Sequence, residues 1–176
     1  IQRRAKYLLI ETTQGHLIIH LGMSGCLKVV PHNTPIEKHD HIDFILSNKH
    51  TLRYHDPRRF GCVLWTDQPP DQHRLLATLG PEPLEPAFNC EYLYDLCQQR
   101  RCSIKQLIMN SNVVVGVGNI YVNEALFLAG IHPSQPANQL QVTDCQQLID
   151  SIQIVLQQAI DAGGTTLKDF KNATGK

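Results

Sequence analysis

The segment Asp56-Pro57-Arg58-Arg59-Phe60-Gly61 places two guanidinium groups and an aromatic ring close together. Asp-Pro pairs favour turns, so these side chains are expected at a loop tip. A guanidinium there can pair with the edge of an unpaired base, and a ring can stack on a neighbouring base. Such a tip could fill the gap that a base leaves when it is extruded from a duplex. A surface arginine pair with Phe60 packed inward explains the same residues equally well.

The segment His20-Leu21-Gly22-Met23-Ser24-Gly25 carries a methionine among turn-forming residues. Methionine usually fills gaps in a hydrophobic core. Because glycine and serine flank it, Met23 could instead lie exposed at a loop tip. An exposed apolar tip suits a wedge that enters a base stack and kinks the duplex.

A third basic segment, Arg3-Arg4-Ala5-Lys6-Tyr7, stands just ahead of an apolar run. The usual role of such residues is to form a solvated basic face. A lysine beside two arginines could also hold a phosphate or transfer a proton.

The stretch from Val113 to Pro133 combines a glycine turn with a helical pattern. Gly116 and Gly118 allow a tight turn, and Asn119 occupies a natural N-cap position ahead of apolar residues at helical spacing. A glycine turn at a helix N-terminus can bind a phosphate through free backbone N–H groups. Taken alone, the stretch is better explained as a well-capped helix in an ordinary bundle.

The elements that would position these residues change character along the chain. Short apolar runs typical of strands occupy 7–11, 16–21, 41–46, 51–54 and 62–65. A proline- and acid-rich stretch follows, and its segment 80–86 is predicted to be an extended linker. Helical spacing then begins, with predicted capping boxes at Ser103/Gln106 and Thr143/Gln146. The predicted fold is α+β, with an antiparallel β-sandwich in 1–80 and helices in 81–176.

Composition sets broad limits. Sixteen basic and sixteen acidic residues give a formal net charge of zero, without the basic excess usual in nucleic-acid-binding proteins. The six cysteines show neither CxxC pairs nor zinc-finger spacing to histidine, so they are expected to be reduced and to bind no metal. Without a signal peptide or an apolar run of transmembrane length, the protein is expected in the cytoplasm and away from membranes.

Four segments together resemble the formamidopyrimidine-DNA glycosylase family: RRAKY, HLGMSG, DPRRFG, and GVGNIY with the later AGIHP. The resemblance extends from Arg3 to Phe170 and implies a helical domain with a helix-two-turn-helix motif. It implies base-excision repair by a bacterial, monomeric enzyme that binds damaged double-stranded DNA. The implied activity removes 8-oxoguanine and formamidopyrimidines, and then cleaves the strand by β,δ-elimination as an AP lyase.

The resemblance also implies roles for individual residues. Lys6 matches the lysine that donates a proton in β-elimination, and Glu124 is expected close to the lesion pocket. Arg58 would face the orphaned cytosine, with Met23 and Phe60 as two inserted wedges. The full set of DNA-binding residues implied in this way is His39, Arg58, Arg100, Met23, Phe60, Lys105, Asn119 and Lys168.

Some parts of the family pattern are not found in the chain. The family's nucleophile is an N-terminal proline followed by a catalytic glutamate, and its C-terminal zinc finger holds the only implied cofactor. Because the chain begins at Ile1 and contains neither feature, it is expected to be a fragment of a longer protein. Alone it is expected to bind damaged DNA, without glycosylase activity and without zinc.

Three other functions stay open on the sequence. The related endonuclease VIII branch acts on oxidised pyrimidines, but it does not resemble both HLGMSG and DPRRFG. A non-catalytic module that binds damaged DNA would need only the loops and the glycine-turn helix. A protein-binding domain is favoured slightly by the zero net charge and opposed by the four motifs.

Overall fold

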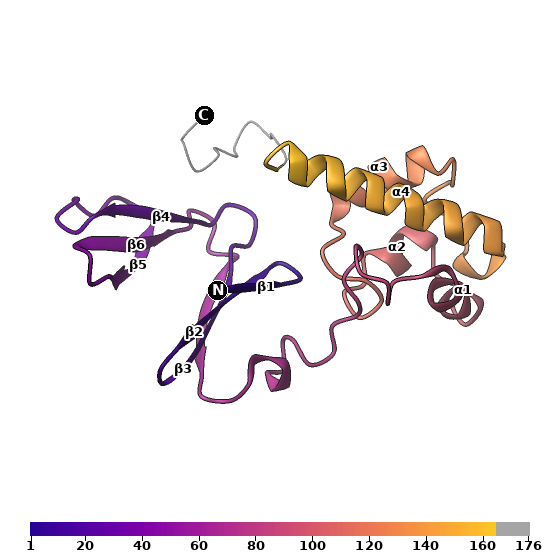
Figure 1. Ribbon diagram of the computed structural model, residues 1–176. Coiled ribbons are helices and arrows are strands. Elements are labelled where there is room, and N and C mark those ends of the chain that lie inside the picture. Colours follow the sequence, from indigo (N-terminus) through magenta and orange to yellow (C-terminus); the bar gives the residue numbers. More distant parts are fainter. Residues whose placement is uncertain (165–176) are drawn as a thin grey trace. The chain divides into compact units, whose positions relative to one another are not determined.

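The computed structural model describes residues 1–164 and divides into two compact units. The first comprises Ile1–His73 and holds the strands, whereas the second starts at Arg74 and holds the longer helices (Figure 1). Antiparallel sheets followed by helices confirm the predicted α+β class. Within the described residues, no helix combines the length and the apolar character that crossing a membrane requires.

Seven strands form two antiparallel sheets in the first unit. One sheet has the order β1-β2-β3-β7 and the other the order β4-β6-β5. The strand bounds are β1 (Gln2–Arg4), β2 (Tyr7–Thr12), β3 (Gly15–His20), β4 (Cys26–Pro31), β5 (Asp40–Ile45), β6 (His50–His55) and β7 (Cys62–Thr66). A 3₁₀ turn, η1 (Pro70–Gln72), follows the last strand.

The predicted strands are confirmed, and two further strands were not anticipated. The predicted strands 7–11 and 16–21 form the β2–β3 hairpin, which turns between Thr12 and Gly15. Side chains alternate along β5, with Ile42 and Phe44 half-buried between exposed neighbours. The unanticipated strands are β1, which is short and polar, and β4, which pairs with β6. Their conformation depends on pairing with strands elsewhere in the chain, which local periodicity does not show.

Two loops connect the two sheets, and they do so at the same place. Residues 21–25 lead from β3 to β4, and residues 56–61 lead from β6 back to β7. His20 pairs with Cys62 in one sheet, and Cys26 pairs with His55 in the other. Both loops therefore span the same gap between the sheets, and we call them the Met23 loop (21–25) and the Arg58 loop (56–61).

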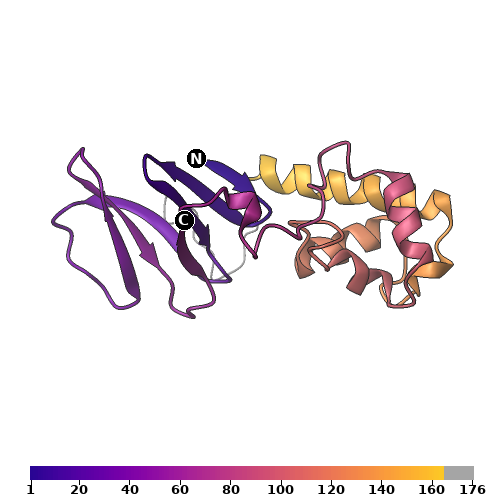
Figure 2. The same ribbon diagram turned by 90° about the horizontal axis from the view of Figure 1, so that it is seen from below.

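The second unit is built from α1 (Cys90–Gln98), α2 (Ile104–Ile108), α3 (Asn119–Leu128), α4 (Val142–Asp161) and the 3₁₀ turn η2 (Ala137–Gln139). Helix α4 packs against α3 and α1, and Figures 1 and 2 show it as the long helix of the unit. The core contains completely buried side chains from each helix, including Leu93, Ile104, Leu126 and Leu148. Each such side chain stabilises the fold by about 1.5–3 kcal/mol relative to exposure.

The helix ends test the capping predictions. Ser103 accepts a hydrogen bond from the Gln106 N–H at 3.3 Å, which confirms Ser103 as the cap in the first predicted box. The predicted Thr143/Gln146 box is wrong, because α4 already starts at Val142 and Asp144 accepts from the Gln141 N–H at 2.9 Å.

The start of α3 differs from the prediction by one residue. The N-cap is Gly118, whose backbone is still extended, and Asn119 is the first helical residue. The prediction failed because it assumed a side-chain cap, and Gly118 provides none. At the other end, Gly130 adopts φ +65° and its N–H bonds to the Phe127 carbonyl at 3.1 Å, as expected for a C-terminal glycine.

The proline-rich segment 80–86 lies within the second unit, which begins before it. Gly80 N–H donates to the Ser111 carbonyl at 2.8 Å, and Val115 N–H donates to the Pro81 carbonyl at 3.1 Å. The segment is thus hydrogen-bonded to the stretch that leads into α3.

Candidate functional site

A buried carboxylate connects the Met23 loop to the Arg58 loop. Asp56 has no exposed surface. Its Oδ1 accepts from the Ser24 hydroxyl at 2.7 Å, and its Oδ2 accepts from the Gly61 N–H at 2.9 Å and the Tyr54 hydroxyl at 3.0 Å. Burial of the charge acts to raise the pKa of Asp56, but the hydrogen bonds outweigh it and lower that pKa to about 2. The group is therefore ionised at neutral pH.

The backbones of the two loops also touch. Gly22 adopts φ +64°, and a Cβ built on it would lie 2.6 Å from the Gly61 nitrogen and from the Phe60 carbonyl carbon. A side chain at residue 22 would therefore separate the loops. The Arg58 N–H donates to the Ser24 hydroxyl at 3.2 Å and adds a second direct link.

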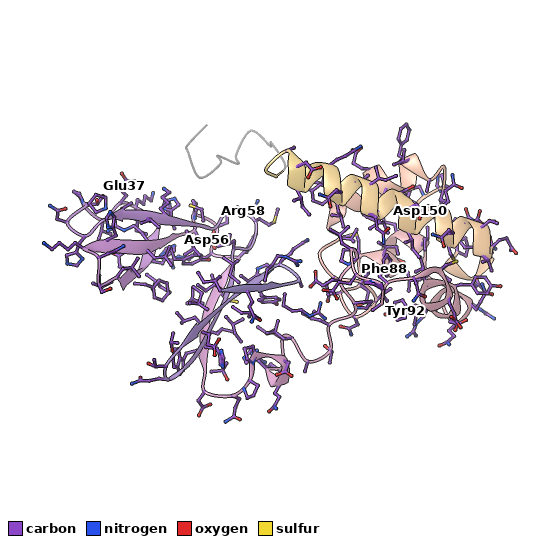
Figure 3. The ribbon with its side chains drawn as sticks, viewed as in Figure 1. Glu37, Asp56, Arg58, Phe88, Tyr92 and Asp150 are labelled. Carbon is purple, nitrogen blue, oxygen red and sulfur yellow. The ribbon has the colours of Figure 1, made fainter. Side chains whose placement is uncertain are left out.

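The tips of these linked loops carry exposed side chains. Met23 is 59% exposed and Phe60 is 60% exposed, although both are apolar. The Arg58 guanidinium carbon lies 4.9 Å from the centre of the Phe60 ring, within the range of a cation–π contact. Figure 3 shows Arg58 and Asp56 in the part of the unit where the chain passes between the sheets. The structure brings Met23, Arg58 and Phe60 to one place. The sequence also allowed Phe60 to be packed inward, and the exposed side chain excludes that arrangement.

His39 lies beside the start of the Arg58 loop. Its carbonyl accepts from the Asp56 N–H at 3.0 Å, and its ring stands 6.0 Å from the His55 ring in an edge-on arrangement. Desolvation, together with the nearby Lys38 and His55 charges, lowers the pKa of His39. His39 is thus neutral at physiological pH, with a half-buried ring.

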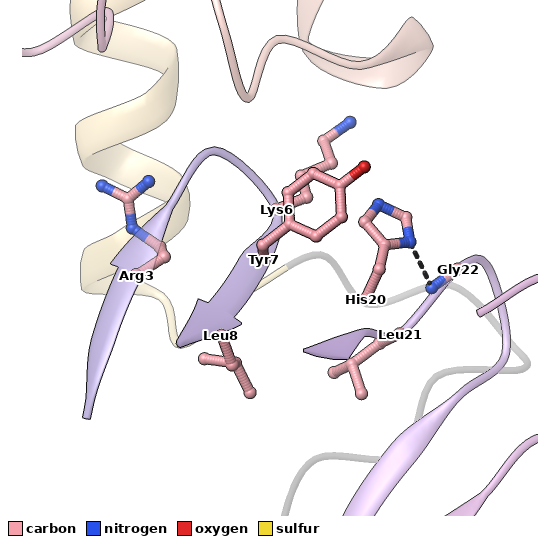
Figure 4. Close-up of a pocket in the computed structure, with 7 residues that line it drawn as sticks. All are labelled: Arg3, Lys6, Tyr7, Leu8, His20, Leu21 and Gly22. Carbon is pink, nitrogen blue, oxygen red and sulfur yellow. Dashed lines mark hydrogen bonds between the residues drawn. The ribbon is translucent and has the colours of Figure 1, made fainter. Parts of the chain in front are cut away.

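Lys6 lies at a shallow pocket of about 250 Å³ in the first sheet (Figure 4). The pocket is lined by Arg3, Lys6, Tyr7, Leu8, His20, Leu21 and Gly22, so it adjoins the Met23 loop. Partial burial lowers the pKa of Lys6, which makes its ammonium group a better proton donor than a solvated lysine.

Sequence reasoning missed two residues of this pocket, His20 and Tyr7. Their rings are 4.8 Å apart, and the Nδ1 atom of His20 accepts from the Gly22 N–H at 3.0 Å. Burial, with a smaller effect of the Lys6 charge, lowers the pKa of His20 and favours its neutral form. The hairpin provided a signal, because pairing Thr12 with Gly15 places Tyr7 opposite His20.

In the second unit, the predicted residues lie on helices and near their ends. Arg100 is exposed directly after α1, and Glu124 is exposed on α3. Lys105 lies in the first turn of α2, and its N–H donates to the Pro133 carbonyl at 3.3 Å. That bond links α2 to the AGIHP segment.

Asn119 is exposed at the start of α3, after the glycine turn in which Gly116 adopts φ +79°. Lys168 lies outside the described residues.

No cluster of three or more His, Cys, Asp or Glu side chains between residues 1 and 164 is arranged to hold a metal ion. The described residues therefore do not fit the zinc that the resemblance implies for the whole family.

Comparison with known proteins covers both units. A family model described as the formamidopyrimidine-DNA glycosylase N-terminal domain matches residues 1–63, and one described as the H2TH domain of the same glycosylase matches residues 79–171. A formamidopyrimidine-DNA glycosylase from Hydrogenovibrio crunogenus is 61% identical over the whole chain. The chain spans 63% of the length of that relative.

Solved structures agree with the sequence relatives. Lactococcus lactis Fpg (MutM), in a complex with FAPY-dG-containing DNA, is 36% identical with a TM-score of 0.87, over 99% of this chain and 65% of that one. A MutM structure in complex with carbocyclic 8-oxo-G containing DNA is 38% identical with a TM-score of 0.88, over the same shares. With both units matched and the linked loops in place, the chain belongs to the formamidopyrimidine-DNA glycosylase family.

Proposed function

We propose that this chain recognises damaged double-stranded DNA, and that the whole protein to which it belongs removes oxidised purines, 8-oxoguanine and formamidopyrimidines, with AP lyase activity. One observation carries the proposal: Met23, Arg58 and Phe60 project from two loops that are fastened together by Asp56. Two relatives with the same fold are described as complexes with DNA that contains FAPY-dG or 8-oxo-G. One copy of the chain would suffice, because both loops come from the same unit.

The loops would act by taking the place of the extruded nucleotide. Met23 and Phe60 are exposed apolar groups that would insert between bases, where packing against them offsets part of the cost of unstacking the duplex. Arg58 carries the hydrogen-bond donors for an orphaned base, and for cytosine these would meet its carbonyl and ring nitrogen. The contact of Arg58 with the Phe60 ring holds the guanidinium at the same tip.

Lys6 would donate a proton during strand cleavage. General acid catalysis is most effective when the pKa of the donor lies near the working pH, and partial burial shifts Lys6 in that direction. Arg3 lines the same pocket and would favour a phosphate there. His39 lies next to the Arg58 loop and would contact the strand beside the lesion.

The second unit would hold the DNA backbone. The glycine turn before α3 and the helix N-terminus at Asn119 suit a phosphate, with Lys105 and Arg100 supplying further positive charge. Glu124 lies on the same helix as Asn119 and would be close to the damaged nucleotide. Lys168 is proposed as a further phosphate contact on the motif match alone.

The test is binding to a short duplex with an abasic-site analogue opposite cytosine, compared with the same duplex undamaged. We expect tighter binding to the damaged duplex, and a loss of that preference in Met23→Ala and in Arg58→Ala. Val29→Ala is the matched control, because Val29 is 65% exposed on β4, away from the loop tips. Equal binding to both duplexes by a folded wild-type chain would contradict the proposal.

The choice of oxidised purines over oxidised pyrimidines has its own test. The whole protein should incise a duplex with 8-oxoguanine opposite cytosine much faster than one with thymine glycol. The reverse order would assign the protein to the pyrimidine-specific activity of the endonuclease VIII branch. If the protein binds the damaged duplex but incises neither the 8-oxoguanine nor the thymine glycol duplex, it is a non-catalytic module that binds damaged DNA.

A further inference from the structure

The Asp56 carboxylate bonds to Ser24, Gly61 and Tyr54, not to the side chains that the proposed function uses on DNA, and it is completely buried. We propose that Asp56 is a positioning residue, whose carboxylate fastens the Met23 loop to the Arg58 loop so that the three probing side chains enter DNA as one preorganised unit. The effect on DNA rests on the proposed function. The fastening itself is a property of the free protein and can be tested separately.

The donors to the Asp56 carboxylate come from both loops and from β6. The Ser24 hydroxyl comes from the Met23 loop, and the Gly61 N–H comes from the far end of the Arg58 loop. Tyr54 comes from β6 and anchors the carboxylate to the sheet at 3.0 Å. The Asp56 side chain therefore connects the two ends of the Arg58 loop to each other, to the Met23 loop and to strand β6.

The Ser24 hydroxyl group acts both as a donor and as an acceptor. The single hydroxyl hydrogen of Ser24 is directed to Asp56, which leaves the oxygen of Ser24 free to accept from the Arg58 N–H at 3.2 Å. The position of the Arg58 backbone thus depends on the carboxylate through Ser24. No direct contact between Asp56 and the guanidinium is needed.

A carboxylate has two acceptor oxygens, and both are used at Asp56. One accepts from Ser24, and the other accepts from Gly61 and Tyr54. In Asp56→Asn, the amide has nearly the same size but only one acceptor oxygen. If that oxygen faces Ser24, the amide NH₂ meets the Gly61 N–H and the Tyr54 hydroxyl. If it faces Gly61 and Tyr54, the NH₂ meets the Ser24 hydroxyl, whose hydrogen then loses its acceptor. The first orientation breaks the link to the Gly61 N–H, and the second reverses the bond to Ser24 and leaves the Ser24 hydroxyl hydrogen without its acceptor.

Fastened loops would favour binding to damaged DNA over binding to undamaged DNA. Undamaged DNA is bound mainly through phosphates, which does not require the wedges to enter the base stack. Insertion beside an extruded nucleotide requires Met23, Arg58 and Phe60 in one arrangement, and ordering loose loops at that moment weakens binding. Loosening the loops should therefore weaken binding to damaged DNA more than to undamaged DNA.

The fastening can be measured without DNA through the methionine methyl groups. The chain has two methionines, Met23 in the loop and Met109 at the end of α2, so methyl-labelled NMR spectra contain one probe and one internal control. In Asp56→Asn we expect the Met23 methyl signal to move and its order parameter to fall, while the Met109 signal stays. Ser24→Ala, which keeps the carboxylate and its other two donors, should give a smaller change of the same kind.

The consequence for DNA is measured with the abasic and undamaged duplexes. In Asp56→Asn the ratio of the two dissociation constants should fall about tenfold, with undamaged binding nearly unchanged. Asp43→Asn is the matched control, because the Asp43 carboxylate lies in the same unit and bonds Arg53 of β6 at 2.8 Å rather than a loop residue. Circular dichroism confirms that each variant is folded, and Ser24→Ala serves if Asp56→Asn is not.

The outcomes separate the two proposals. An unchanged Met23 signal in both loop variants would overturn the fastening role, as would an equal loss of preference in Asp43→Asn. A wild-type chain that binds both duplexes equally would overturn the proposed function. In that case, the NMR result would still decide whether Asp56 fastens the loops.

Discussion

At the residue scale, the charge of Asp56 makes loop stability depend on pH. Its pKa falls from an ordinary value of 3.8 to about 2 in the folded protein. A carboxyl whose pKa is depressed by folding stabilises the fold above its unfolded pKa and loses that contribution as pH falls through the folded value. We expect the difference in unfolding free energy between wild type and Asp56→Asn to be constant above about pH 5 and to shrink between about pH 4 and pH 2.

Urea unfolding followed by fluorescence gives this difference. Trp65 is the single tryptophan of the chain and lies in β7 of the same unit. A difference that does not change down to pH 2 would show that folding does not lower the pKa of Asp56. Because each measurement is a comparison with Asp56→Asn, the other low-pKa carboxyls of the unit cancel.

A second prediction at this scale compares two glycines of almost the same backbone conformation. Gly22 has φ +64° and Gly130 has φ +65°. A Cβ at Gly130 meets nothing within 4 Å. Backbone strain in Gly130→Ala should therefore lower the free energy of unfolding by only about 1 kcal/mol. A Cβ at Gly22 would stand 2.6 Å from the backbone of the Arg58 loop, so Gly22→Ala should lose clearly more.

The two losses are read separately, with Trp65 fluorescence for the strand unit and far-ultraviolet circular dichroism for the helices. Gly22→Ala should also reduce the preference for the abasic duplex, because it separates the loops. Similar losses at the two positions would mean that the loops can move apart without strain.

At the element scale, α4 provides a test of which cap is used. Asp144 accepts from the Gln141 N–H at 2.9 Å at the start of the helix. Removing such a cap destabilises a helix by about 1 kcal/mol, so Asp144→Ala should lower the stability of the helical unit by that amount. Thr143→Ala removes an exposed side chain with no part in the cap and should change stability by less than about 0.5 kcal/mol. Thermal unfolding followed at 222 nm compares them, and a larger loss in Thr143→Ala would restore the cap predicted from sequence.

At the scale of the whole molecule, a chain with a formal net charge of zero is proposed to bind a polyanion. Local clusters of positive charge can do so, and each phosphate contact releases counterions, which gives a slope of about −0.9 in a plot of log affinity against log salt concentration. Arg100→Ala should reduce the slope by about one such contact and weaken damaged and undamaged duplexes alike. Arg58→Ala should weaken the damaged duplex selectively.

Fluorescence anisotropy over a salt series measures both effects. Gln157→Ala is a neutral control on the exposed side of α4. An unchanged slope in Arg100→Ala would remove Arg100 from the proposed phosphate contacts. A slope near zero for the wild type would instead favour the protein-binding function that its zero net charge allowed.

The sequence by itself determined much of this protein, because several of its signals are local. Alternation in β5, the polar turn of the β2–β3 hairpin, the Ser103 cap and the stop at Gly130 each depend on neighbours within a few residues, and each is observed. The α+β class follows from the change of period along the chain. The four motifs indicated the family. Three of them, RRAKY, HLGMSG and DPRRFG, lie in the strand unit, where the structure brings their residues together.

Only the tertiary structure decided how the site is built. Ser24 and Asp56 are 32 residues apart, and nothing near either residue indicates that they are bonded. Their contact exists because β3 pairs with β7 while β4 pairs with β6, so that both connecting loops cross the same gap. Strand pairing between distant segments depends on the packing of the whole unit, and this is why the tips of Met23, Arg58 and Phe60 were predictable from sequence while the buried carboxylate that holds them was not.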